Sequence, residues 1–569
     1  MTKFAAIVLS LSVVAASFIP GTSAATKAAG KVAGDKSRPR YVENQVLIKF
    51  KQGAEPVVTG DFIDDRMLPL PKAKARAVGA RDLVERAGLY VLELDASISV
   101  EEAVRQASAD PRVEYAEPNY LYYTAETRPN DPNFSDMWGL FNPNCDDCNN
   151  PNPRADIGAV AAWDITTGSP DLVVGVIDSG ADLAHPDLAP NAWVNPNEIA
   201  GNLIDDDRNG YVDDINGWNF ADDENKVFNN ASVDFHGTHV AGTIGAAGNN
   251  RIGVTGVAWN VKLMSLKFLG KKKGTGSTAD AVAAIEYAID QRRRGVNLRV
   301  LNASWGGEGE SLALREAIAA AGEAGILVVC AAGNDSSDTD ITPEFPTAWS
   351  KDLNTLISVA AINQTGMLAD FSNFGRRTVD VAAPGYQILS LYPHDPERAP
   401  EGGYTVANGT SMATPHVSGV AVLVWSAEPG LTPAQVKRRI VSTSEPTVML
   451  SSGISSAGQV NAYNALTNRV VAPRRPQVGA VEFKKKELII DGIGFLAGSA
   501  VVEVNGVALS VTPVFDESYK IANGTLTRLV VPLGKKGMKK TFPRGFSGQL
   551  SVFNSSTGER SDQTAVTKF

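Results

Sequence analysis

The chain has 569 residues, more than one ordinary domain holds, and its 43% hydrophobic and 20% charged content is typical of a folded globular protein. A formal net charge of −10 argues against a nucleic-acid partner, because a phosphate-binding face is normally basic. The short lysine clusters at 271–273, 484–486 and 535–536 are interpreted as solvated loop or edge-strand charges.

Residues 1–25 are arranged like a secretory signal peptide. Lys3 precedes an apolar run from 4 to about 19, and small residues follow at 21–25. A membrane anchor would need a longer apolar stretch, and no later segment supplies one. We therefore expect a soluble protein without a membrane span, secreted to the periplasm, the cell surface or the medium.

The cysteines are Cys145, Cys148 and Cys330. The first two can close a small disulfide loop in an oxidising compartment, whereas Cys330 lies in an apolar run and is expected in the core. A zinc site would need further ligands at short spacing, and the sequence offers none.

Residues 41–125 are predicted to form a small α+β domain. Strands are expected at 46–50, 89–95 and 113–120, and 100–108 is an amphipathic helix whose apolar residues share one face. This segment has a core of its own and no residues that resemble a catalytic site.

Residues 129–470 alternate between apolar strands and helices, which predicts a parallel β-sheet with helices on both faces. The expected strands are 172–178, 261–269, 298–304, 326–332, 356–362 and 379–383, and the expected helices are 236–247, 278–294, 312–323, 411–427 and 433–443. Because ligands bind beyond the carboxyl ends of such strands, a site is sought there.

Residues 474–569 are predicted to form a separate β-sandwich-like domain, entered through a proline-containing linker at 472–476. Short strands are expected at 480–490, 500–504, 529–531 and 548–553, and no helical pattern is found there.

Three polar residues stand where acyl-transfer chemistry would need them. Asp178 ends an apolar strand, His236 opens a small-residue helix, and Ser411 follows a Gly-Thr turn at the head of another helix. In such a set the imidazole takes the serine proton, and the carboxylate fixes the imidazole tautomer. Ser411 taken alone is better explained as a helix N-cap.

The chain has five histidines, which limits the alternatives. His236 and His239 can instead bind a metal, but their spacing is shorter than in His-Glu-x-x-His and contains no glutamate. Structural roles are expected for His185 and His416, and His394 lies in a polar loop.

Asn334 follows the expected strand 326–332. Its amide can donate to an oxyanion beside the backbone N–H of Ser411, although an asparagine after glycine is also common in turns.

The segments 176–180, 236–242, 331–334 and 409–415 resemble the signature blocks of the subtilases, the subtilisin-like serine endopeptidases, in the family order Asp, His, Asn, Ser. The resemblance covers about 130–466. It implies that Asp178 orients, His236 is the general base and acid, Ser411 is the nucleophile and Asn334 stabilises the oxyanion.

The same resemblance implies that substrate pairs as a β-strand with Ser304, Trp305 and Gly306, near Ala332 and Gly333. Such pairing reads the backbone, so broad specificity is expected. A narrow processing protease is the competing hypothesis, and Asp335 and Glu344 alone do not establish an acidic pocket for basic residues.

The domain at 41–125 resembles a subtilase propeptide, a folding aid and intramolecular inhibitor, so we expect a zymogen cut between about Tyr120 and Pro129. The domain at 474–569 is weakly similar to Ig-like IPT/TIG domains, which suggests a protein or glycan ligand. A catalytically idle scaffold is the alternative function, but an idle relative should lack at least one of the four site residues.

An acidic loop at 205–213 is the candidate metal site. Asp205, Asp207, Asn209 and Asp213 occupy positions of an EF-hand-like calcium loop, Tyr211 is counted among the ligands, and Gly210 stands at the turn. The last position of such a loop is Asn216 and not glutamate, so an acidic surface turn is the alternative. Asp131 resembles another calcium ligand of the family. A structural Ca²⁺ is therefore expected, and no organic cofactor.

Overall fold

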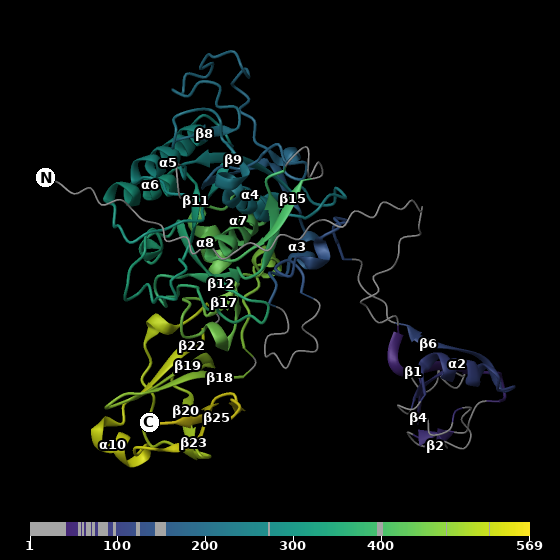
Figure 1. Cartoon of the computed structure of the whole chain (residues 1–569). Helices are drawn as coiled ribbons and strands as arrows, with labels where there is room; N and C mark the ends of the chain where they lie inside the picture. The colour runs from purple at the N-terminus through teal and green to yellow at the C-terminus, as the bar shows by residue number, and fades with distance from the viewer. Residues whose placement is uncertain are drawn as a thin grey trace. The chain divides into compact units, whose positions relative to one another are not determined.

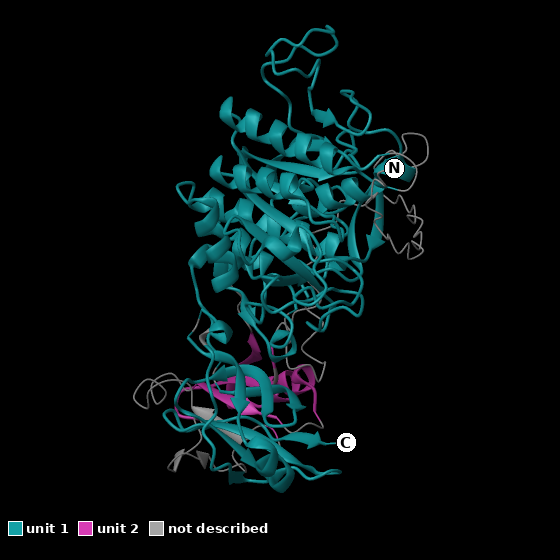
Figure 2. Ribbon diagram, turned by 90° about the vertical axis from the view of Figure 1, so that its left-hand side faces the viewer, with its two compact units in different colours: residues 1–20, 126–569 teal, residues 21–125 magenta. Residues whose placement is uncertain are grey.

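A computed structural model describes residues 41–54, 58–59, 62–63, 70, 74–77, 89–94, 98–120, 126–142, 155–270, 274–394, 402–473, 475–522 and 524–568. The chain divides into two compact units, coloured separately in Figure 2: residues 21–125, and residues 126–569 with 1–20. The expected signal peptide and the pair Cys145 and Cys148 lie outside the described residues. Within those residues, no helix is long and apolar enough to cross a membrane.

The described residues of the smaller unit form a four-stranded antiparallel sheet and helix α2 (Val100–Ser108). The order is β4 (Lys74–Ala77), β5 (Leu89–Glu93), β1 (Tyr41–Phe50) and β6 (Val113–Tyr120), and β2 (Val58–Thr59) pairs separately with β3 (Phe62–Ile63). Helix α2 begins where the Ser99 side chain accepts the Glu102 N–H, and it buries Val100, Ala103 and Ala107. The elements predicted for this segment therefore form.

The larger unit is built on a nine-stranded sheet (Figure 1). Its order is β16 (Glu445–Pro446), β17 (Gly458–Gln459), β13 (Val381–Pro384), β12 (Leu356–Ile362), β11 (Leu327–Ala331), β10 (Leu298–Ala303), β7 (Gly168–Asp178), β9 (Asn260–Lys267) and β8 (Gly217–Asn219). All neighbours pair in parallel except β16, which is antiparallel to β17.

Helices cover both faces of this sheet, as predicted. On β7, Val174 and Val176 belong to a core that includes α4 (Ala231–Gly245), α7 (Thr410–Ala427), α8 (Pro433–Ser442) and α9 (Ala462–Thr467). Val173 and Ile177 belong to a second core with α5 (Thr278–Arg293) and α6 (Leu312–Glu323). Because alternate residues of a strand point to opposite faces, these are the two sides of one sheet. Cys330 is buried in the second core, as expected.

Two elements near the expected site differ from the prediction. Helix α4 begins at Ala231 and not at His236, because the Asn230 side chain caps it by accepting the Ser232 N–H. The hairpin of β14 (Ile388–Tyr392) and β15 (Gly403–Ala407), which leads directly into α7, was not predicted.

The C-terminal region forms two sheets around one core. One sheet contains β18 (Gln477–Phe483), β19 (Leu488–Phe495) and β22 (Leu526–Val531), and the other contains β20 (Ala500–Val504), β21 (Val507–Ala508), β23 (Ser547–Asn554), β24 (Glu559–Arg560) and β25 (Thr564–Thr567). The strand predicted at 480–490 is wrong, because it spans the turn of the β18–β19 hairpin. The expectation of no helix is also wrong: α10 (Gly534–Thr541) forms, although Met538 is its single buried residue and most of its other residues are lysines and glycines.

Candidate active site

Asp178 and His236 form a hydrogen-bonded pair at the carboxyl end of the central strands. Asp178 is the last residue of β7 and is fully buried, and its Oδ1 accepts the His236 Nδ1–H at 2.7 Å. The backbone N–H of Ser179 donates to the same oxygen, also at 2.7 Å. The carboxylate therefore holds the imidazole in one orientation and leaves its Nε2 as the proton acceptor.

The electrostatic surroundings of His236 favour its charged form. Burial by itself lowers the pKa of this imidazole, but the charge of Asp178 and the hydrogen bond to it outweigh burial, and the net pKa is raised above the usual 6.5. The pair can thus hold a proton taken from a nearby hydroxyl.

Ser411 lies in the first turn of α7. The residue before that helix is Gly409, whose φ of 150° suits only glycine, and no side chain caps the helix, so the capping role considered for Ser411 is wrong. The Ser411 Oγ–H donates to the Ser304 carbonyl at 3.0 Å, and the Ser304 Oγ–H donates back to the Ser411 carbonyl at 2.9 Å. Across the described ranges, no hydrogen bond joins Ser411 Oγ to His236, a bond that in catalytic sites often forms only with substrate.

Asn334 lies just beyond β11, facing the start of α7. Its Oδ1 accepts the Thr410 N–H at 2.8 Å and the Thr410 hydroxyl at 3.1 Å. Those two bonds fix the amide plane and turn its Nδ2 towards Gly409, where an added Cβ would lie 3.8 Å from that nitrogen. The Nδ2–H groups can therefore donate to an oxygen held beside the first turn of α7.

The segments expected to bind substrate follow β10 and β11, which are neighbouring parallel strands. The Trp305 side chain does not face the site: it is 7% exposed, its Nε1–H donates to the Ile177 carbonyl at 2.9 Å, and its ring lies 4.8 Å from that of Phe268. Only the backbone of Trp305 is left to meet a substrate, so the indole is a core residue.

The other histidines have structural partners. His239 is fully buried, its Nε2 lies 3.0 Å from the Ile388 carbonyl, and burial lowers its pKa to about 4. In the described parts of the chain, it belongs to no group of residues that could hold a metal. His416 bonds the Met412 carbonyl within its own helix, and His185 bonds Gly403, as expected for structural residues.

A buried ion pair that sequence reasoning missed lies beneath the site. The Lys267 Nζ donates to Asp234 and to the Ser179 carbonyl, and both side chains are at most 1% exposed. Asp234 is in the first turn of α4, Lys267 ends β9 and Ser179 follows β7. The pair therefore ties the helix that carries His236 to the strand that carries Asp178.

Replacing Lys267 by methionine is expected to destabilise the protein by about 3–5 kcal/mol, because Asp234 is left as an uncompensated buried charge. Guanidinium unfolding of the full-length precursor, compared in a Ser411→Ala background to prevent self-digestion, measures the loss. Lys262→Met is the matched control, because Lys262 lies on the same strand and only donates to a surface carbonyl. Equal midpoints for the two variants would contradict the importance of the buried pair.

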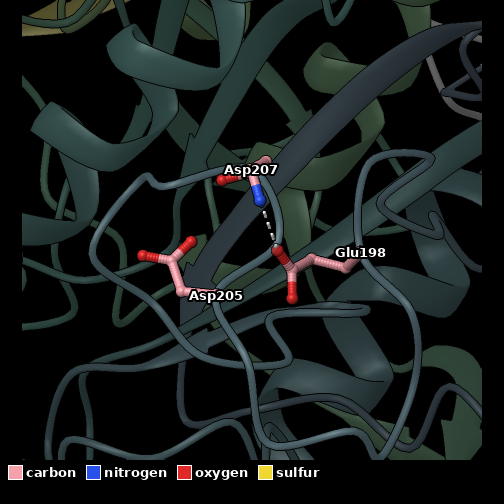
Figure 3. A group of neighbouring side chains, drawn as sticks. All are labelled: Glu198, Asp205 and Asp207. Carbon is pink, nitrogen blue, oxygen red and sulfur yellow. Dashed lines mark hydrogen bonds between the residues drawn. The ribbon is translucent and has the colours of Figure 1, made fainter.

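Three carboxylates converge in the acidic loop (Figure 3). Oxygens of Glu198, Asp205 and Asp207 lie within 4.8 Å of one another, and Glu198 accepts the Asp207 N–H at 3.0 Å. Asp207 Oδ1 is buried without a hydrogen-bond partner, and the nearest cation is the Arg294 guanidinium at 3.7 Å. Three hard oxygen donors this close together fit a divalent cation.

The remaining predicted ligands of this loop lie in different surroundings. Asp213 accepts the backbone N–H groups of Gly201 and Leu203, Asn209 Oδ1 accepts the Tyr211 N–H, and the Tyr211 ring packs among aromatic side chains. The structure thus groups Asp205 and Asp207 with Glu198, a residue that precedes the loop and that its spacing pattern could not identify.

Asp131 lies near a second buried acid that the sequence analysis overlooked. Asp131 accepts the N–H groups of Asn249 and Asn250, and the Asn250 side chain donates to Asp187 at 2.7 Å. Burial raises the pKa of both carboxyls, that of Asp187 to about 7. Two buried acids sharing one loop, with no ion pair recorded for either among the described residues, are also compatible with a cation.

A parallel sheet that presents an Asp–His pair and a serine at its carboxyl edge is the architecture of a serine hydrolase. Residues 169–471 match the Subtilase family, and residues 27–119 match the fervidolysin N-terminal prodomain. The chain belongs to the subtilase family and is a subtilisin-like serine protease with a prodomain.

Its relatives include an extracellular protease of Xanthomonas campestris pv. campestris, 33% identical over 477 residues that make up 80% of this chain and 78% of that protein. A thermophilic serine proteinase of a Bacillus species is 32% identical over 428 residues, 75% of this chain and 88% of that protein. A solved protease from Pseudoalteromonas arctica is 30% identical, with 60% of this chain and 99% of that one covered and a TM-score of 0.46.

Proposed function

We propose that this protein is a secreted serine endopeptidase that cleaves peptide bonds through an acyl-enzyme, with Asp178, His236 and Ser411 as its triad. The observation that carries the proposal is the 2.7 Å hydrogen bond between His236 Nδ1 and buried Asp178, at the sheet edge where α7 begins with Ser411. A relative named as an extracellular protease supports the export step.

In the proposed reaction, Ser411 Oγ attacks the scissile carbonyl while His236 Nε2 takes its proton, and Asp178 stabilises the resulting imidazolium. The oxyanion accepts hydrogen bonds from the Asn334 side chain and the Ser411 N–H. His236 then donates its proton to the leaving amine. Water activated by the same imidazole releases the acyl group from Ser411 and restores the enzyme.

Substrate recognition is proposed to use the backbone of Ser304, Trp305 and Gly306 as one strand, with Ala332 and Gly333 facing it. Main-chain pairing gives affinity without reading side chains, which favours many sequences over one. The prodomain is proposed to act as an intramolecular inhibitor that is cut away between about Tyr120 and Pro129. We further propose that the C-terminal domain, with its two sheets, binds a protein or a glycan.

The test is covalent labelling with a phosphonofluoridate during a casein digest. The proposal predicts that casein is degraded, that the reagent stops degradation, and that mass spectrometry finds the adduct on Ser411. An inert protein that binds its ligands but neither cleaves casein nor takes up the reagent would instead be an idle scaffold.

We also propose that Ca²⁺ stabilises the fold, held by Glu198, Asp205 and Asp207, with Asp131 and Asp187 as a second position. The support is the set of converging carboxylates, including the Asp207 oxygen that accepts no hydrogen bond among the described residues. A bound cation would offset the negative charge that these neighbouring carboxylates bring together.

Removing calcium is therefore expected to lower the thermal midpoint, because a ligand at 100 times its Kd stabilises the native state by about 2.7 kcal/mol. The midpoint is measured with calcium and with chelator in the Ser411→Ala background. Asp205→Asn is expected to shrink the difference, whereas Asp352→Asn, which neutralises an exposed turn residue, keeps it. Equal midpoints in calcium and chelator would refute the stabilising ion.

A further inference from the structure

The carboxyl group of Glu344 lies between the two segments proposed to bind substrate, which follow β10 and β11. A Cβ added to Gly333 would come within 2.1 Å of Glu344 Oε2, and one added to Gly306 would come within 2.9 Å of Glu344 Oε1. Glu344 therefore touches the Cα atoms of both glycines, one in each segment. The backbone next to it is anchored, because Gly307 and Phe345 exchange hydrogen bonds of 2.9 and 2.8 Å.

The carboxyl group of Glu344 is held in place on one side only. Asn373 is 1% exposed, and its Nδ2 donates to Glu344 Oε2 and, at 3.1 Å, to the Ala332 carbonyl. Its own Oδ1 is fixed by the N–H groups of Asp335 and Ser337, both at 2.9 Å. Glu344 Oε1 has no hydrogen bond or ion pair among the described residues, so one oxygen is oriented and the other is available.

Among the described residues, no cation pairs with this carboxyl group. Burial, together with the charges of Asp335 and Glu308, raises the pKa of Glu344 to about 7, although the hydrogen bond from Asn373 opposes the shift. A desolvated carboxylate without a cation is costly, and a cation brought by a ligand would remove that cost.

The geometry of the proposed reaction brings a substrate side chain to this place. The residue whose carbonyl is attacked must lie with its oxygen at Asn334 and its backbone along Ser304–Gly306. Gly306 and Gly333 follow β10 and β11, which are adjacent parallel strands, so we expect the side chain of that same residue to be directed to where these two glycines meet. The carboxyl group of Glu344 lies against both glycines.

We propose that Glu344 selects a positively charged residue, lysine or arginine, on the acyl side of the cleaved bond. The inference rests on the proposed protease function and adds the substrate class to it. Backbone pairing keeps the other positions tolerant, whereas this one position reads charge. A lysine or arginine side chain that reaches between the two segments donates to the available Oε1 of Glu344.

The experiment compares fluorogenic peptides that differ only at this residue, lysine in one and methionine in the other, since these side chains have similar length. The wild-type ratio of kcat/KM, lysine over methionine, is expected to be about 10- to 100-fold at pH 8.5, as for one hydrogen bond to a charged group. In Glu344→Gln the ratio is expected to fall to about one. Glu310→Gln, which neutralises an exposed carboxylate that follows the same strand β10, is expected to keep the wild-type ratio.

The pH dependence of this ratio gives a second readout. Because the pKa of Glu344 lies near 7, its carboxyl group is mostly neutral at pH 5 and charged at pH 8.5, so the wild-type ratio is expected to rise over that range. Ionisation of His236 alters both rates equally and cancels. In Glu344→Gln the ratio is expected to stay flat.

A wild-type ratio at or below one overturns the proposal, and so does a ratio that survives in Glu344→Gln. These outcomes differ from failure of the proposed protease function, in which neither peptide is cleaved and no adduct forms on Ser411.

Discussion

Ser411→Ala is expected to lower kcat for peptide hydrolysis by about 10⁶-fold. The variant keeps α7 and the substrate-binding backbone but has no hydroxyl to form the acyl-enzyme. Subtilisin, a member of this family, loses about 2 × 10⁶ in kcat on the same change, and we carry that measured value over. The measurement is single-turnover cleavage of a fluorogenic peptide, with intact-mass analysis of the precursor.

The matched control is Ser426→Ala, because Ser426 lies on the same helix and only bonds the Val422 carbonyl of an earlier turn. It is expected to keep kcat close to the wild-type value. If the prodomain is removed by the protein's own active site, the precursor of Ser411→Ala remains uncut while that of the control matures. Casein degradation by Ser411→Ala at the wild-type rate would refute the assignment of the nucleophile.

Asp178→Asn is expected to lower kcat by about 10⁴-fold, the size seen when this aspartate is neutralised in other serine proteases. The carboxylate charge helps to raise the pKa of His236, so its removal lowers that pKa. In addition to the loss in kcat, the acid limb of the pH–rate profile should therefore move to lower pH in the variant. An amide that turns its Nδ2 towards His236 would also impose the wrong imidazole tautomer.

A second aspartate–histidine pair supplies the control for this change. Asp182 is 2% exposed, and its carboxylate accepts a hydrogen bond from His394 Nδ1 at 2.8 Å; among the described residues it makes no hydrogen bond or ion pair with His236. Asp182→Asn is expected to leave the acid limb of the pH profile in its wild-type place. If both variants move the limb equally, the raised pKa of His236 does not depend on its bond to Asp178.

The sequence predicts those parts of the fold that depend on local periodicity. Helices α2 and α6 and strands β6, β12 and β20 have the predicted bounds, because each is bordered by a clear change in apolar spacing. Strands buried on both faces stand out as continuous apolar runs, which is why the order of the central strands and helices could be predicted. The position of the candidate site follows for Asp178, which ends β7, for Asn334, which lies just beyond β11, and for Ser411 in the first turn of α7. His236 differs, because it lies in the second turn of α4 and not at its start.

The remaining features depend on contacts between distant segments. Lys267 looks like a charged residue at a strand end, yet it is buried against Asp234 of helix α4. Glu198 and Glu344 stand in polar loops, where glutamate is usually solvated. Only their approach to other segments gives them a possible role. The start of α4 is different, because its capping residue Asn230 is of a type that the sequence can identify as an N-cap.

The reciprocal hydrogen bonds between Ser411 and Ser304 have a consequence for the timing of the proposed reaction. While the Ser411 hydroxyl donates to the Ser304 carbonyl, its proton points away from the base. The side chain must rotate about χ1 before transfer, giving up a bond worth about 1 kcal/mol. Ser304 belongs to the strand that peptides are proposed to pair with. Peptide binding and the release of the Ser411 hydroxyl for proton transfer therefore involve the same residue, Ser304. The unliganded protease is then a slow nucleophile towards small electrophiles, and a peptide that pairs along this strand makes it a fast one.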